Sequence, residues 1–193
     1  MASFGTNSKF AKPEESSGSS SGSYFHANKI PLNGEARLHV LSEQPLEYYE
    51  LWCEDANQKR QTVRFEEDPS PADIEEALGE TLVRGMDKFN DGQPEKIKSV
   101  MAFTVYNYDT ESVQIAAVNQ KTIINQILSV ATDEDYQPLT DWDLKIGKRL
   151  EGSKTVYDVK AVKMQKGFDR DPEVAKAKKI NLEALLTNEN PFA

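Results

Sequence analysis

The chain has 193 residues, a net charge of −9 and 38% hydrophobic residues, which suits one domain with tails. No apolar run approaches the roughly 20 residues needed to cross a bilayer, and the first residues lack the apolar stretch of a secretory signal. The single cysteine, Cys53, excludes an internal disulfide and a cluster of thiolate metal ligands. We therefore expect a cytoplasmic protein.

Composition predicts three regions along the chain. Residues 1–23 are rich in serine and glycine, which is typical of a disordered tail. We expect one folded domain over residues 24–166. Residues 167–193 are polar but include apolar residues at helical spacing, so a C-terminal helix followed by a mobile tail is expected there.

The first half of the domain reads as strands followed by a helix. Apolar and polar residues alternate over 36–40, and aromatic or β-branched residues fill 46–53 and 59–65. A helix is then expected from Ser70 as N-cap with Pro71 at its first position. Its apolar stripe runs on through Leu82 to Met86.

The second half continues with more strands. The longest strand is expected over 95–109, followed by a hairpin partner over 112–118 and a helix over 119–131. Two final strands are expected over 142–150 and 155–163. About seven short strands with inserted helices predict a mainly β (α+β) fold, an OB-like small closed barrel.

The charge is uneven along the chain. Acidic residues dominate residues 66–95, whereas basic residues dominate residues 145–166. Two solvated faces would give the same pattern, so this asymmetry does not by itself predict a function. An acidic chain is repelled from nucleic acid at long range, so a binding site for it would need local positive charge.

Few residues indicate catalysis. His26, His39 and Cys53 have no neighbours with the spacing of a metal site or a catalytic triad, and no phosphate-binding loop occurs. Asp133, Glu134 and Asp135, with Asp141 and Asp143 nearby, leave a metal-dependent hydrolase as a minor alternative. We expect no enzymatic activity, no cofactor and no metal.

Aromatic and basic residues share the predicted strands. Single-stranded nucleic acid is bound by rings that stack on its bases and by cations that follow its backbone. Aromatic residues are also common in strands for packing alone. The candidate DNA-binding residues are Arg37, Tyr48, Trp52, Arg60, Arg64, Lys98, Tyr106, Tyr108, Trp142, Lys145, Lys148 and Lys154.

Several short motifs occur in the order found in a known family. They are VYNYD at 105–109, QKTI at 120–123, DED at 133–135, DLKI at 143–146 and YDV at 157–159. Over roughly residues 24–165 the chain thereby resembles the phage single-stranded DNA-binding proteins of OB-fold type. The resemblance implies sequence-independent coating of exposed single strands in phage DNA replication or recombination, in the cytoplasm of the host. Some members of the wider group hold a structural zinc on Cys and His; one cysteine and two histidines make zinc unexpected here.

The expected partner is therefore single-stranded DNA. Replication or recombination proteins could be recruited through the C-terminal tail, no membrane partner is expected, and self-association stays open. The main alternative is an OB-like protein-interaction module whose aromatic residues pack against another protein instead of nucleic acid.

Overall fold

The computed structural model describes residues 23–87 and 92–193, so nearly all of the expected N-terminal tail lies outside the described residues. The described strands are β1 (Tyr24–Phe25), β2 (Glu35–Val40), β3 (Leu46–Asp55), β4 (Arg60–Phe65), β5 (Leu82–Arg84), β6 (Lys98–Asn107), β7 (Ser112–Val118), β8 (Trp142–Glu151) and β9 (Lys154–Lys163). The helices are α1 (Pro71–Leu78), α2 (Lys121–Thr132) and α3 (Asp171–Ala177). Short 3-10 helices are η1 (Ala27–Lys29), η2 (Glu134–Tyr136), η3 (Leu139–Asp141) and η4 (Leu182–Leu185).

The described strands form one mixed sheet, so the mainly β, α+β prediction is confirmed. Its order is β1-β7-β6-β2-β8-β9, and β3 pairs with β6, β4 and β5. Only β1 and β7 run parallel within the described part of the chain. The sheet is not closed over these residues, so the expected closed barrel is not confirmed.

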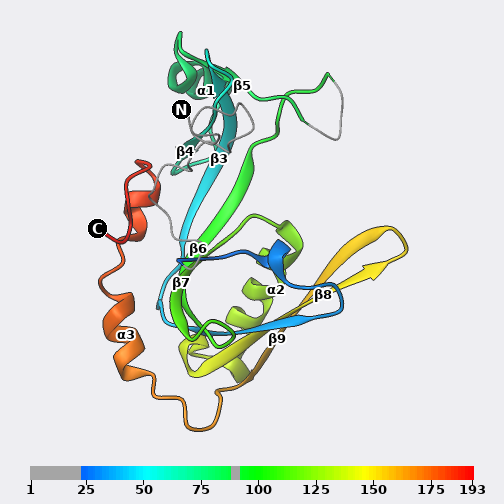
Figure 1. Cartoon of the computed structure of the whole chain (residues 1–193), viewed down its shortest axis with the longest axis vertical. Helices are drawn as coiled ribbons and strands as arrows, with labels where there is room; N and C mark the ends of the chain where they lie inside the picture. Colours follow the sequence, from blue (N-terminus) through cyan, green and yellow to red (C-terminus); the bar gives the residue numbers. More distant parts are fainter. Residues whose placement is uncertain (1–22, 88–91) are drawn as a thin grey trace, which may run out of the picture.

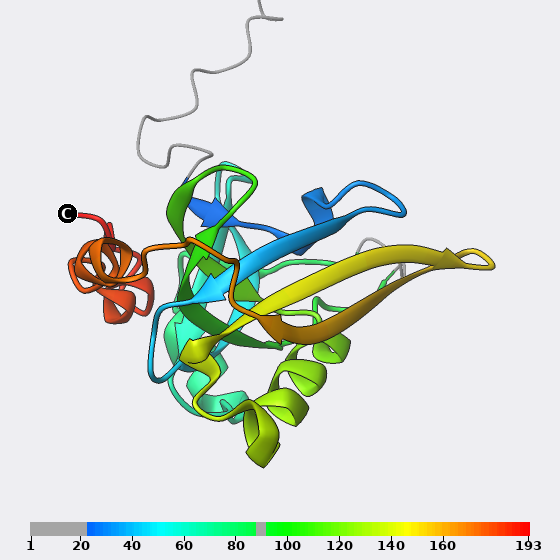
Figure 2. The same cartoon turned by 90° about the horizontal axis from the view of Figure 1, so that it is seen from below.

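The alternation along each strand decides which sheet face becomes the core. On β2, Ala36, Leu38 and Val40 are buried on one side, and Arg37 and His39 point to the other. The strands β8 and β9 form a long hairpin that projects from the rest of the molecule (Figure 2). Gly152 lies in its turn with φ of +63°, a conformation that favours glycine.

Helix α1 begins as its sequence predicts and ends earlier than expected. The Ser70 hydroxyl accepts a hydrogen bond from the backbone N–H of Asp73, whose carboxylate accepts one from the backbone N–H of Ser70. Gly79, with φ of +53°, ends the helix. The predicted continuation to Met86 is wrong, because residues Leu82–Arg84 pair with β3 as strand β5.

Helix α2 covers one face of the sheet. Ile123 and Ile127 of α2 pack with Leu38, Phe103 and Leu144 in the main hydrophobic core. The Gln126 amide also bonds the edge strand β9: it donates to the Tyr157 carbonyl at 3.1 Å and accepts from the Val159 N–H at 2.9 Å. None of the described helices has the length and apolar character that spanning a membrane requires.

The C-terminal segment (residues 164–193) covers the other face. Figure 1 shows it running along the side of the molecule away from α2. Leu185 packs against Tyr48, Val100 and Ile115 in a second apolar cluster, and the Phe192 ring lies 5.6 Å from that of Tyr24. The single C-terminal helix expected within residues 167–193 is divided into α3 and η4.

We predict that Leu38→Ala lowers the free energy of unfolding by about 2–5 kcal/mol, because Leu38 is fully buried and the substitution leaves a cavity in the core. Urea denaturation measures this change. The control is Leu32→Ala: its side chain is 50% exposed, and the change should stay within about 0.5 kcal/mol. Equal losses in the two variants would contradict the core described above.

Candidate nucleic-acid interface

The sheet register brings most of the candidate residues to one surface, which we call the outer face. Residues directly opposite each other in a pleated sheet project from the same side. Arg37 lies opposite Lys145, and His39 lies opposite both Tyr106 and Asp143. Further along the sheet, Glu50 lies opposite both Arg64 and Lys98.

Alternation along the strands extends the outer face to other candidates. Tyr48 and Trp52 lie on the same side of β3 as Glu50. Arg60 on β4 lies opposite Glu54, which is on the same side of β3 as Glu50. Lys154 on β9 lies opposite Glu151, which is on the same side of β8 as Asp143. Among the candidates only Trp142 and Lys148, at even positions of β8, project from the side that carries Leu144 and Ile146.

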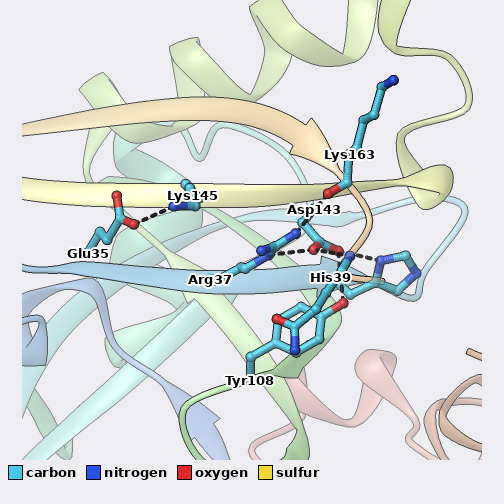
Figure 3. A network of polar contacts seen from close by, with 8 residues as sticks. Glu35, Arg37, His39, Tyr108, Asp143, Lys145 and Lys163 are labelled. Atoms are coloured by element: carbon cyan, nitrogen blue, oxygen red, sulfur yellow. Dashed lines mark hydrogen bonds and ion pairs between the residues drawn. The ribbon is translucent and has the colours of Figure 1, made fainter. Parts of the chain in front are cut away.

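A buried carboxylate organises the centre of the outer face (Figure 3). Asp143 has no exposed surface and accepts four hydrogen bonds from described residues. Arg37 Nε donates to Oδ2 at 2.6 Å, and the Tyr108 hydroxyl donates to Oδ1 at 3.0 Å. The backbone N–H of Gln165 donates to Oδ2 at 3.0 Å, and His39 Nδ1 lies 2.9 Å from Oδ1. Since a carboxylate only accepts, Nδ1 of His39 carries the proton.

These contacts set the protonation of the cluster. Burial alone raises the pKa of Asp143, but the hydrogen bonds from His39, Arg37 and Tyr108 outweigh it and hold that pKa below its usual value. Burial and the neighbouring Asp143 charge raise the pKa of the Tyr108 phenol. Asp143 is therefore an anion that neutralises Arg37, whose Nη2 also donates to the Lys163 carbonyl at 2.8 Å.

An aromatic cluster adjoins this network. The ring centroid of Phe168, in the C-terminal segment, lies 4.7 Å from that of Tyr106, 5.1 Å from Tyr108 and 5.0 Å from His39. The rings of Tyr106 and Tyr108 meet edge to face at 5.2 Å. Both candidate tyrosines are thus half-buried beneath a residue of the same chain.

The C-terminal segment also occupies the part of the outer face beside β3 and β4. Tyr48 is 3% exposed, and burial raises its pKa to about 12. Arg64 lies over the Tyr48 ring at 5.6 Å and donates from Nη1 to the Leu185 carbonyl and to Asn188 Oδ1. Neither side chain meets solvent freely in this arrangement.

The remaining candidates lie at the margins. The Arg60 guanidinium lies over the half-buried Trp52 ring at 5.2 Å. Lys98 and Lys145 form ion pairs with Glu95 and Glu35 respectively. Lys154 is exposed near the tip of the β8–β9 hairpin.

The two candidates on the opposite face have structural contacts. The Trp142 ring meets that of Tyr136 edge to face at 5.0 Å. Lys148 Nζ donates to the carbonyls of Asn28 and Ile30, which fixes the turn before β2.

The acidic candidates do not converge. Asp133, Glu134 and Asp135 are exposed at η2, whereas Asp143 is buried in the network described above. No group of three or more potential metal-ligating side chains occurs among the described residues. The acidic 66–95 stretch forms α1 and β5 at the β3–β4 end, with Lys88 and Asp91 outside the described residues.

Sequence reasoning missed His39, Asp143 and Phe168 as members of this surface. Alternation along β2 and β8 indicated that His39 and Asp143 share a side with Arg37 and Lys145, but only the pairing of these strands shows that they touch. Phe168 lies in a polar stretch of sequence, and nothing in its neighbouring residues predicts that it contacts the sheet.

We predict that Asp143→Asn lowers the free energy of unfolding at pH 7 by about 2–4 kcal/mol, because it leaves the half-buried Arg37 and the buried His39 without their anion. The lowered pKa means that the carboxylate stabilises the native protein above the ordinary aspartate pKa of about 4, and that this stability is lost as the pH falls below it. Urea denaturation at a series of pH values measures both effects.

The control for this prediction is Asp158→Asn. Its side chain is 40% exposed and pairs with Lys160, so the substitution should lower the free energy of unfolding by less than about 1 kcal/mol. If Asp143→Asn unfolds with the same free energy and the same pH dependence as the unmodified chain, the network does not stabilise the fold.

Comparison with known proteins gives no relative. No protein-family model, no curated protein and no solved structure matches the chain. Its function is therefore inferred from its own residues and their geometry.

Proposed function

We propose that the chain is a sequence-independent single-stranded DNA-binding protein that uses the outer face of its sheet. The observation that carries this proposal is the register: it gathers aromatic and basic side chains from β2, β3, β4, β6, β8 and β9 on one side. Rings and cations on one surface are what single strands require, because bases stack and phosphates pair with cations.

The two ends of the outer face indicate how a strand would run. At one end Trp52 and Arg60 form a ring with a cation over it. At the other end the β8–β9 hairpin carries Lys145, Arg149 and Lys154 on the same side. Tyr106 on β6 and Tyr108 just beyond its end lie between the strands that bear these ends. A backbone that follows the cations would thus pass the central rings.

The sequence resemblance to phage single-stranded DNA-binding proteins supports the same proposal. The resemblance implies a role in phage DNA replication or recombination, in the host cytoplasm, and it implies that the sheet with α2 between β7 and β8 is an elaborated OB-like fold. Neither catalysis nor a cofactor is part of this proposal.

An OB-like protein-interaction module remains the alternative. The burial of Tyr48 and Arg64 beneath the C-terminal segment favours it, because these candidates already pack against polypeptide. The net charge of −9 also weakens long-range attraction to nucleic acid.

We predict that the protein binds a labelled poly-dT of about 30 nucleotides, a length chosen to exceed the site of one OB fold. Fluorescence anisotropy at two salt concentrations should show weaker binding at higher salt, because phosphate contacts release counterions. Duplex DNA should not displace the oligonucleotide. No binding even at low salt would overturn the proposal and favour the protein-interaction module.

We predict that Trp52→Ala weakens oligonucleotide binding by about 1–3 kcal/mol, because it removes one stacking ring and the support of Arg60. The matched control is Tyr49→Ala, which removes a half-buried ring from the other side of the same strand. Its affinity should equal that of the unmodified chain. Equal losses of affinity in the two variants would show that the oligonucleotide does not bind specifically to the outer face.

A further inference from the structure

Phe168 occupies a socket on the outer face. Its walls are Tyr106, Tyr108 and His39, whose ring centroids all lie within 5.1 Å of the Phe168 centroid. Phe168 is itself only half-buried. A cavity of about 320 Å³ adjoins it, lined by both tyrosines, by residues 165–169, by Glu111 and by Glu173.

The socket has a polar atom that Phe168 does not satisfy. His39 Nε2 is buried and has no hydrogen-bond partner among the described residues. A buried nitrogen without a partner costs free energy, and a phenyl ring cannot supply one. A nucleobase has similar flat faces, so it can stack on the same rings, and its edge carries hydrogen-bonding groups.

We propose that this socket is a base-binding site of the outer face and that residues 164–170, here called the gate loop, close it with Phe168 until single-stranded DNA displaces the ring. The inference rests on the proposed function and adds to it a specific pocket and its regulation. The ligand of the socket is one unpaired base of a single strand.

The attachments of the gate loop allow such an exchange. Its backbone is bonded to the outer face through the Gln165 N–H and Asp143 Oδ2. Gly167 has φ of +83°, and a side chain added there would meet no atom within 4 Å, so the loop is not packed at this point. Arg170 pairs with Asp141 at 2.8 Å, and Leu185 remains packed against Tyr48. Phe168 can therefore leave while the rest of the C-terminal segment stays in place.

The first test is the affinity of Phe168→Ala for the labelled poly-dT. Without the Phe168 ring the socket should be open more often, and poly-dT should bind about three- to tenfold more tightly. The matched control, Phe65→Ala, removes a half-buried ring from β4 opposite Tyr49, on the other side of the sheet. Its affinity should not change. Equal or weaker binding by Phe168→Ala in a folded protein contradicts the gate.

The second test uses the unmodified chain and does not depend on how the variant folds. Hydrogen–deuterium exchange, followed by mass spectrometry, should become faster in residues 164–170 when poly-dT saturates the protein. Unchanged or slower exchange in a DNA-bound protein overturns the gate and leaves DNA binding intact. If neither the unmodified chain nor Phe168→Ala binds poly-dT, the proposed function itself fails.

Discussion

The burial of one charge, on Asp143, determines much of how this molecule is assembled. A carboxylate without solvent contact is tolerated only when its lone pairs are satisfied and a positive charge is near. Here β2 supplies Arg37 and His39, the turn after β6 supplies Tyr108, and the chain beyond β9 supplies the Gln165 N–H. Strand pairing, hairpin position and the exit of the C-terminal segment are thus coordinated at a single side chain.

The two faces of the sheet are covered in different ways. Helix α2 contributes fully buried aliphatic residues to a continuous core on one side. On the outer face the C-terminal segment makes separate small contacts. Phe168 packs on the Tyr106 ring, Leu185 packs in the second apolar cluster, and Phe192 packs on Tyr24. A covering made of separate contacts can open in parts, because each contributes only a fraction of the total stability. The face with the divided covering is also the one that carries the candidate DNA-binding residues.

Local patterns in the sequence predicted most of the strands and the start of α1. Strict alternation identified residues 36–40, and Ser70 with Pro71 marked the helix start, because both signals depend only on near neighbours. The apolar stripe through Leu82 wrongly predicted a longer α1, since the pairing of β5 with β3 overrides helical spacing. The closed barrel could not be tested by such patterns, because closure depends on which distant strands pair.

The same local patterns predict part of the candidate site, namely which side of a strand each residue occupies. Alternation along β6 is enough to put Tyr106 on the side of Lys98 and Phe103 on the other side, where it packs in the core. It could not show that Tyr48 is buried or that Arg64 binds the Leu185 carbonyl, since both depend on a segment more than 100 residues away in the chain. The Asp143 cluster likewise joins residues that only the folded sheet brings together.

The bonds of Gln126 to β9 bear on how copies of this protein could assemble. A free strand edge invites pairing with the edge of another molecule. In the middle of β9 the Gln126 amide takes the place of the neighbouring strand and uses both the Tyr157 carbonyl and the Val159 N–H. This edge is therefore blocked against strand addition at its centre. Copies of this protein that associate would have to meet through other surfaces.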